Sequence, residues 1–248
     1  MYEAMIAETI GINGNNRDVI QAYYARPITA SPVPGVIVLH HMPGWDEWSK
    51  EVTRKFAYHG YAAICPHLYS RLGPGRWDDV AAAARAQGGV SDAQVVGDAS
   101  GAAAFLRSQP DANGRVGVIG FCSGGRQSYM LACKIPSLNA AVDCWGGRVI
   151  APPDQLTPQQ PVPVIEMTKD MNCPLLGIFG NDDMNPDVAQ VNRTEEILKE
   201  LGKDYEFHRY DGAGHGFFAV DRPGYRPEQA VDGWKKVFAF YEKHLVRS

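Results

Sequence analysis

The sequence predicts one α/β domain over residues 1–248, with a mostly parallel central sheet and helices on both of its faces. Two observations lead to this prediction. Strand-like and helix-like segments alternate along the chain, as they do in α/β proteins. Several strand-like segments are continuous apolar runs, which is typical of parallel strands that helices cover on both sides. Ligands bind such sheets at the carboxyl ends of the strands, so reactive residues are expected directly after them.

The first part of the chain predicts a hairpin followed by one β-α-β unit. Two strand-like segments, residues 6–12 and 19–24, have no helical segment between them. A strand at 35–40, an amphipathic helix at 48–59 and a strand at 61–66 come next. Because a helix connects the two later strands, they are expected to run parallel.

The remainder of the chain continues the alternation. In the expected helix at 92–109, Val95 and Leu106 belong to a set of apolar residues at helical spacing, and Pro110 marks the end. The proline-rich residues 151–163 interrupt the pattern and are either a flap over the strand ends or a plain surface loop. The other elements expected are a strand at 115–120, a helix from Ser123, strands at 140–144 and 175–179, a helix at 186–201, a strand at 205–210 and a helix at 227–244.

Composition and charge favour a small-molecule partner. The net charge is −4 and the sequence has no basic stripe, so binding to nucleic acid or to an anionic membrane has no electrostatic support. The N-terminal residues lack a signal-peptide pattern, and no apolar run reaches the roughly 18 residues of a membrane span. We therefore expect a cytoplasmic protein, either a monomer or a homodimer. The five cysteines are scattered and odd in number, which argues against a disulfide framework or a paired zinc site.

Residues 120–125, Gly-Phe-Cys-Ser-Gly-Gly, form the most informative stretch of the sequence. They lie between an expected strand and an expected helix and match the nucleophile pattern G-x-S-x-G, with Cys122 in place of serine. Gly120 and Gly124 would leave space around a strained turn. A cysteine at a helix N-terminus also has its reactive thiolate form favoured. The competing interpretation is a small buried cysteine, which would not require such a turn.

A thiol nucleophile needs a base and a group that orients the base, and both follow later strands. Asp182 and Asp183 come directly after the strand at 175–179, and His215 comes after the last strand. Of the two aspartates we expect Asp182 to orient the base, with Asp183 as the second choice. Glycines on both sides of His215 would allow its loop to approach closely.

With this turn and these later residues, the chain resembles the dienelactone hydrolase family of α/β-hydrolases over nearly its full length. The resemblance implies the α/β-hydrolase fold, no cofactor, and hydrolysis of an ester or lactone by a triad of Cys122, Asp182 and His215. It also implies an oxyanion hole made by the backbone N–H groups of Met42 and Ser123. The stretches that carry the resemblance are 36–40 leading to Gly44, 60–69 with Arg71, 117–125, 180–182 and 210–217.

Two departures from the family's pattern bear on the substrate. His41 stands where the family has a glutamate, and we hypothesise that it contacts Cys122 or orients the substrate; the alternative is a residue that only packs in its loop. Ala219 stands where the family has an arginine that holds a substrate carboxylate. We therefore expect a neutral or aromatic ester or lactone rather than dienelactone. The residues expected to contact the substrate are His41, Trp45, Tyr69, Arg71, Trp145, Phe217 and Phe218.

Other classes of function have weaker support. The glycines of 117–124 do not form G-x-G-x-x-G, so a nucleotide-binding module is the weaker alternative, together with a non-catalytic small-molecule-binding protein. The neighbours His40 and His41 would point to opposite sides of an extended segment, so no metal site is expected.

Overall fold

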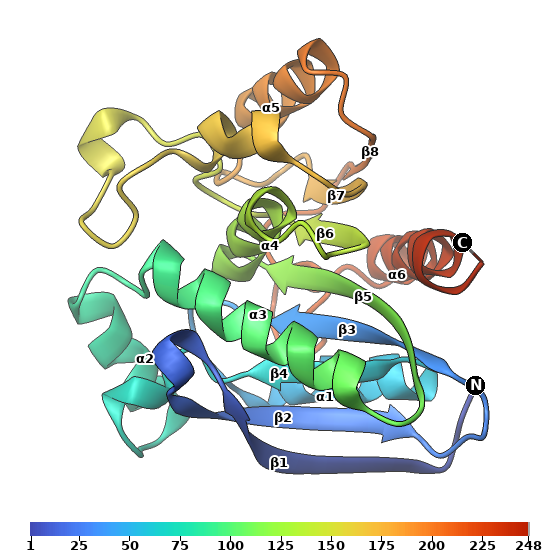
Figure 1. Cartoon of the computed structure of the whole chain (residues 1–248). Coiled ribbons are helices and arrows are strands. Elements are labelled where there is room, and N and C mark those ends of the chain that lie inside the picture. The colour runs from blue at the N-terminus through green and yellow to red at the C-terminus, as the bar shows by residue number, and fades with distance from the viewer. Residues whose placement is uncertain (248) are drawn as a thin grey trace. The chain divides into compact units, whose positions relative to one another are not determined.

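The protein divides into two compact units in the computed structural model, which describes residues 1–247 (Figure 1). The N-terminal unit consists of Met1–Val118 and Thr157–Gln160, and the C-terminal unit consists of Ile119–Leu156 and the residues from Pro161 onward. The eight strands follow the order β1-β2-β4-β3-β5-β6-β7-β8, and β5 (Ala112–Phe121) has residues in both units. The expectation of a single domain stays a prediction.

The N-terminal unit confirms the predicted hairpin and the β-α-β unit. Strands β1 and β2 are antiparallel over their whole length, β2 pairs antiparallel with β4, and β3 and β4 are parallel. Helix α1 packs against β2, β3 and β4, whereas α3 lies on the other side of these strands (Figure 1). The bounds of these elements are β1 (Met5–Asn13), β2 (Val19–Pro27), β3 (Val33–Leu39), α1 (Glu47–Tyr58), β4 (Ala62–Pro66), α2 (Trp77–Ala86) and α3 (Asp92–Ser108).

Local sequence explains where the helices of this unit begin. The Asp46 carboxylate accepts the Ser49 N–H at 3.0 Å and caps α1, and the Ser91 hydroxyl accepts the Gln94 N–H at 3.2 Å and caps α3. All seven residues of β3 are buried, as its continuous apolar sequence predicts. Helix α2 was not among the expected elements, although its Ala-rich sequence favours a helix.

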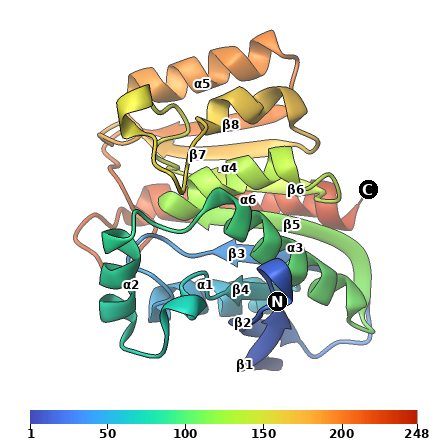
Figure 2. The same cartoon turned by 60° about the vertical axis from the view of Figure 1, so that its left-hand side comes forward.

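The C-terminal unit contains the purely parallel part of the sheet. Strands β6 and β7 are parallel, and so are β7 and β8. Helix α4 packs against β6 and α6 packs against β7, and the two helices lie on opposite sides of β6 (Figures 1 and 2). The bounds are α4 (Ser123–Lys134), β6 (Ala140–Cys144), β7 (Leu175–Gly180), α5 (Val188–Glu200), β8 (Tyr205–Tyr210) and α6 (Pro227–Tyr241). The prediction of a mostly parallel α/β sheet with helices on both faces is therefore confirmed.

The interrupting segment is neither a helix nor a strand of the sheet. Residues Pro153–Gln155 form one 3-10 turn, and Thr157 and Gln160 form an isolated bridge. The Gln159 carbonyl accepts the Asp92 N–H at 3.0 Å, which connects residues 157–160 to the start of α3. A role of this segment as a flap stays a prediction.

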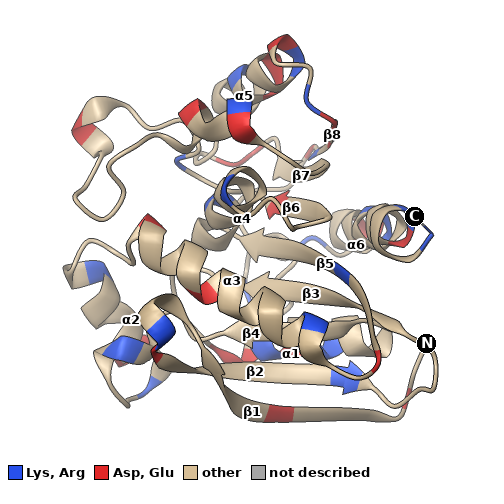
Figure 3. Cartoon of the chain, viewed as in Figure 1, with Lys and Arg blue, Asp and Glu red and all other residues tan. Residues whose placement is uncertain are grey.

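The charged residues are distributed over many elements. Figure 3 shows Lys and Arg as well as Asp and Glu on elements of both units. Within residues 1–247, no helix combines the length and the apolar character that crossing a membrane requires.

Candidate active site

Cys122 occupies the turn between β5 and α4, where the sequence predicts a nucleophile. Its backbone has φ 56° and ψ −117°, a conformation that a non-glycine residue rarely adopts. Gly120 makes this turn possible, because a Cβ at that position would lie 1.8 Å from the Gly124 carbonyl oxygen. The structure therefore has the strand, strained turn and helix that the G-x-C-x-G pattern predicts.

His215 and Asp183 form a hydrogen-bonded pair. The Nδ1–H of His215 donates to Oδ2 of Asp183 at 2.8 Å; the aspartate is 5% exposed, while the imidazole side chain is 39% exposed. The preference for Asp182 is therefore wrong as regards this hydrogen bond. Asp182 is exposed, and its backbone N–H donates to the Ala213 carbonyl at 2.9 Å. The second choice, Asp183, is the residue that reaches the imidazole.

The loops that carry the two residues are held against each other. Gly180 ends β7, and a Cβ there would lie 2.2 Å from the Ala213 carbonyl oxygen, so only glycine permits this approach. Oδ1 of Asp183 accepts the Asn185 N–H at 2.8 Å, which leaves Oδ2 for His215. The hydrogen bond within its own turn thus fixes the Asp183 carboxylate in the orientation that contacts His215.

The surroundings of His215 favour its charged form. Burial acts to lower its pKa, but hydrogen bonds to Asp183 and Cys122, together with their charges, outweigh burial and raise the pKa to about 10. At neutral pH the imidazole is therefore protonated and lies beside the sulfur of Cys122. A neighbouring imidazolium is one of the environments that stabilise a reactive thiolate.

Backbone at the end of β6 holds the backbone of Cys122 in place. The Cys122 N–H donates to the Cys144 carbonyl at 3.1 Å. Asp143, which is 1% exposed, accepts the Gly146 N–H at 2.7 Å and so closes the turn on which Cys144 lies. Burial raises the pKa of Asp143 to about 7, while the hydrogen bond from Gly146 opposes this rise. Asp143 belongs to no motif in the sequence, although an acidic residue inside an apolar strand is an unusual feature.

The aromatic residues near His215 form part of the core. Trp145 is 1% exposed, Phe217 0% and Phe218 2%, and the centroid of the Trp145 ring lies 5.0 Å from those of both phenylalanines. The Trp145 ring also meets the His215 ring edge-on at 6.5 Å between centroids. The side chains of Trp145, Phe217 and Phe218 are enclosed and support the base, and the predicted contact of these three residues with substrate stays a prediction.

Ser123, for which the family resemblance implies a role in the oxyanion hole, directly follows Cys122. It is the first residue of α4, so its N–H is one of the four that have no acceptor within the helix. Its partner in the expected pair, Met42, belongs to the N-terminal unit.

The peptide group that carries the Met42 N–H is fixed within that unit. The carbonyl of the same peptide, which belongs to His41, accepts the Nδ1–H of His40 at 2.9 Å and the Gly44 N–H at 3.0 Å. Nε2 of His40 accepts the Leu68 N–H at 3.3 Å. Burial lowers the pKa of His40 to about 3, so the ring is neutral and can be donor and acceptor at once. His40 is a second residue whose contribution the sequence did not indicate.

His41 and Tyr69 also have partners inside the N-terminal unit. Nε2 of His41 lies 2.6 Å from Oδ2 of Asp46, whose other oxygen caps α1 through Ser49. Burial acts to raise the pKa of Asp46, but the hydrogen bonds from His41 and Ser49 outweigh it and lower the pKa to about 2. The Tyr69 hydroxyl donates to the Met42 carbonyl at 3.1 Å. A contact of His41 with substrate or thiol stays a prediction.

Arg71 holds two parts of the N-terminal unit together through its guanidinium, and its contact with substrate stays a prediction. Its guanidinium donates two hydrogen bonds of 2.9 Å to the fully buried carboxylate of Asp98, one of 2.7 Å to Asp18 and one of 3.2 Å to the Asn15 carbonyl. Hydrogen bonding to Asp98 and Asp18 raises the pKa of Arg71. These contacts connect the turn of the β1-β2 hairpin to α3. They use the planar set of N–H donors of the arginine.

Trp45 lies at the surface of the N-terminal unit with its indole N–H donated to the Cys65 carbonyl at 3.0 Å. Its ring stacks on that of His67, with 4.8 Å between centroids and 13° between planes, and lines a cavity.

No group of three or more His, Cys, Asp or Glu side chains in residues 1–247 is arranged to hold a metal ion.

Residues 20–245 match the dienelactone hydrolase family. The chain is 37% identical over 236 residues to a Methylorubrum extorquens protein assigned as a carboxymethylenebutenolidase, covering 92% of this chain and 78% of the relative. An Escherichia coli K12 protein with the same assignment is 32% identical over 230 residues, with 92% and 83% covered.

Two further comparisons extend the likeness. A Bradyrhizobium protein assigned as a 2-oxo-3-(5-oxofuran-2-ylidene)propanoate lactonase is 28% identical over 240 residues, covering 95% of this chain and 93% of the relative. The crystal structure of a Klebsiella pneumoniae protein assigned as a dienelactone hydrolase superposes with a TM-score of 0.87 at 29% identity, covering 97% of this chain and 100% of that one. These relatives support the predicted α/β-hydrolase fold and do not favour the non-catalytic alternative.

Proposed function

The chain belongs to the dienelactone hydrolase family and acts as a hydrolase of esters or lactones, and we propose that Cys122 is its nucleophile. One observation carries the proposal: the exposed imidazole of His215 is hydrogen-bonded to buried Asp183 on one side and to Cys122 on the other. This is the arrangement of nucleophile, base and orienting acid that nucleophilic catalysis requires.

The reaction proceeds in two steps through a thioester. The Cys122 thiolate attacks the carbonyl carbon, and when the C–O bond breaks, His215 gives its proton to the leaving oxygen. The neutral imidazole then takes a proton from water, whose oxygen attacks the thioester, so that the carboxylic acid is released and the thiolate is restored. Asp183 holds the ring through Nδ1, which leaves Nε2 to exchange the proton.

Negative charge on the attacked carbonyl oxygen needs hydrogen-bond donors. The Ser123 N–H at the start of α4 is suited to this role, since it has no acceptor within its helix and lies at the positive end of the helix dipole. The second donor expected from the family resemblance, the Met42 N–H, stays a prediction.

A neutral or aromatic ester or lactone is the proposed substrate class. Arg71 is occupied by Asp98 and Asp18, so it is not available to bind a substrate carboxylate. Ala219 is apolar and buried where the family has an arginine. A substrate without a carboxylate would not need either positive charge.

The proposal is tested by release of p-nitrophenol from p-nitrophenyl acetate. We expect Cys122→Ala to lose turnover, and Asp183→Asn to lower kcat by roughly 10²–10⁴-fold because the base loses its orientation. Asp182→Asn is the matched control, and we expect its kcat to stay within about two-fold of the wild type because Asp182 does not contact the base.

Substrate charge is tested with the same enzyme. Phenyl acetate should be hydrolysed with a higher kcat/KM than 4-acetoxybenzoate, which differs by a carboxylate. A preference for the charged ester would contradict the substrate class but not the nucleophile. Equal slow release by the wild type and Cys122→Ala would contradict the nucleophile itself.

A further inference from the structure

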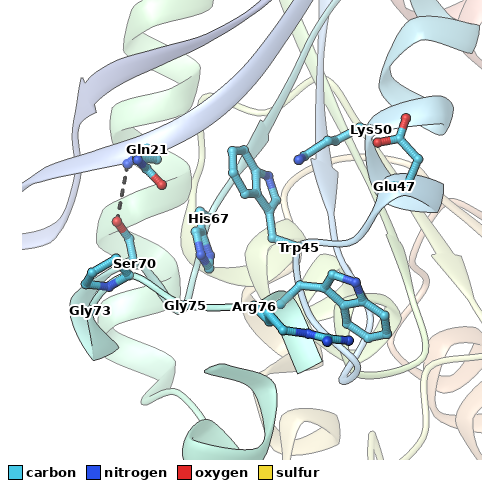
Figure 4. Close-up of a pocket in the computed structure, with 11 residues that line it drawn as sticks. Gln21, Trp45, Glu47, Lys50, His67, Ser70, Gly73, Gly75 and Arg76 are labelled. Carbon is cyan, nitrogen blue, oxygen red and sulfur yellow. Dashed lines mark hydrogen bonds between the residues drawn. The ribbon is translucent and has the colours of Figure 1, made fainter. Parts of the chain in front are cut away.

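A cavity of about 640 Å³ is lined only by residues of the N-terminal unit, none of which is a residue proposed for catalysis (Figure 4). Its volume falls in the range of small-molecule sites. The side chains that bear on its chemistry are Trp45, His67, Trp77, Lys50, Glu47 and Arg76. Aromatic rings and charged groups thus line the same cavity, so a ligand that fits it should contact both.

The rings provide a flat apolar surface. Figure 4 shows Trp45 between His67 and Lys50, in agreement with the stacking distance of 4.8 Å on His67 and a distance of 4.4 Å from the Lys50 ammonium to the ring centroid. Trp77, at the start of α2, also lines the cavity and is 47% exposed. Exposed indole next to a cavity favours a planar aromatic partner over an aliphatic one.

His67 adds a polar atom without adding charge. Burial and, to a smaller extent, the nearby Lys50 ammonium lower its pKa to about 4, so the ring is neutral at neutral pH. The Gln21 amide and the Ser70 hydroxyl lie in the same lining. These groups can hydrogen-bond to a ligand but cannot balance a charge.

The charges of the lining leave one cation uncompensated. Glu47 is paired with Arg54 at 2.7 Å, and Arg76 is paired with Asp78 at 3.1 Å. Within residues 1–247, Lys50 has aromatic contacts, to Trp45 and Tyr23, and no carboxylate partner. The cavity therefore has a positive charge next to the rings, and an anionic ligand could pair with it.

We propose that this cavity is a binding site for a planar aromatic carboxylate, whose ring packs against Trp45, His67 and Trp77 while its carboxylate pairs with Lys50. The site goes beyond the hydrolytic function and does not depend on it, because none of its residues belongs to the proposed triad. An aromatic acid is also what hydrolysis of an ester of an aromatic carboxylic acid releases, together with an alcohol, so the site would recognise the acid product of such a reaction.

The test uses calorimetric titration of the full chain with sodium 2-naphthoate, and with the uncharged isostere 2-naphthamide. We expect naphthoate to bind roughly ten-fold more tightly than the amide, as one charge-assisted hydrogen bond implies. Lys50→Met should remove this preference, and Lys50→Arg should restore most of it. Lys55→Met, on the same helix but outside the lining, is the matched control and should bind both probes as the wild type does.

Two outcomes would overturn the proposal. One is equal affinity of the wild type for the acid and the amide, and the other is unchanged naphthoate binding by Lys50→Met. Replacement of naphthoate by cyclohexanecarboxylate tests the aromatic requirement, and equally tight binding would remove the role given to the indoles. Because the readout is heat of binding, loss of ester hydrolysis in a Cys122 variant leaves this test unaffected.

Discussion

Asp143→Asn is expected to change how the stability of the protein depends on pH. The carboxyl is 1% exposed, and burial raises its pKa from 3.8 to about 7. Between these values the folded protein keeps a proton that the unfolded chain has released. The free energy of unfolding must therefore fall as the pH rises through this window. From pH 5 to pH 8 this single group costs roughly 3 kcal/mol of stability.

Asparagine removes this dependence and keeps the local structure, because its carbonyl oxygen can still accept the Gly146 N–H. Urea unfolding of the wild type and of Asp143→Asn, at intervals from pH 5 to pH 8, measures the effect. The difference between the two free energies should change by roughly 3 kcal/mol over this range in favour of the variant at high pH. Asp154→Asn, at an exposed position, is the control and should follow the wild type. Parallel curves for wild type and Asp143→Asn would refute the argument that burial holds a proton on this group.

Four further predictions follow from single contacts. The pKa of His215 is about 10 in the folded protein and 6.5 in its ordinary state, so its contribution to stability is complete below pH 6.5 and lost as the pH rises through 10. The difference in free energy of unfolding between wild type and His215→Gln, measured in urea, should shrink over that range. Arg71→Met removes the positively charged partner of buried Asp98 and should lower the free energy of unfolding by about 3 kcal/mol; a loss below about 0.5 kcal/mol would contradict a stabilising role of this ion pair. Gly120→Ala should lower both the melting temperature and esterase activity, because its Cβ collides with backbone; an active variant of normal stability would be inconsistent with the observed turn. His40→Leu removes a hydrogen-bond donor to the carbonyl of the peptide before Met42 and should lower kcat roughly ten-fold with little change in KM. An unchanged kcat would show that the position of this peptide does not affect catalysis.

The parts of the site that the sequence predicts are those that depend on neighbouring residues in the chain. The turn at Cys122 requires an apolar strand before it, a helix after it and Gly120 to clear the backbone, and all of these are visible within about twenty residues. The same holds for the hairpin, in which two strand patterns follow each other without a helix. Local pattern was sufficient there because no distant contact is needed to choose between alternatives.

The choice between Asp182 and Asp183 depends on a contact that local pattern does not reveal. Both residues follow β7, and adjacent side chains point in different directions, so one of them must face away from the base. The hydrogen bond from the Asp182 N–H to the Ala213 carbonyl, thirty-one residues later, is part of the geometry that leaves Asp183 facing His215. Arg71 illustrates the same limit, since its partners Asp18 and Asp98 lie 53 and 27 residues away. A cation after a strand resembles a substrate ligand until these partners are known.

Aromatic residues beside a base in the sequence can form either the wall of a cleft or the support beneath the base, and burial decides between the two. Phe217 and Phe218 follow His215 by two and three residues, yet both are enclosed and pack against Trp145, whose ring meets the imidazole. The segment before His215 is held at Ala213 and the segment after it is held by the two phenylalanines. The exposed imidazole is thus positioned by buried residues on both sides. A substitution that loosens this packing should therefore act on kcat through the orientation of the base, even though it removes no group that touches the substrate.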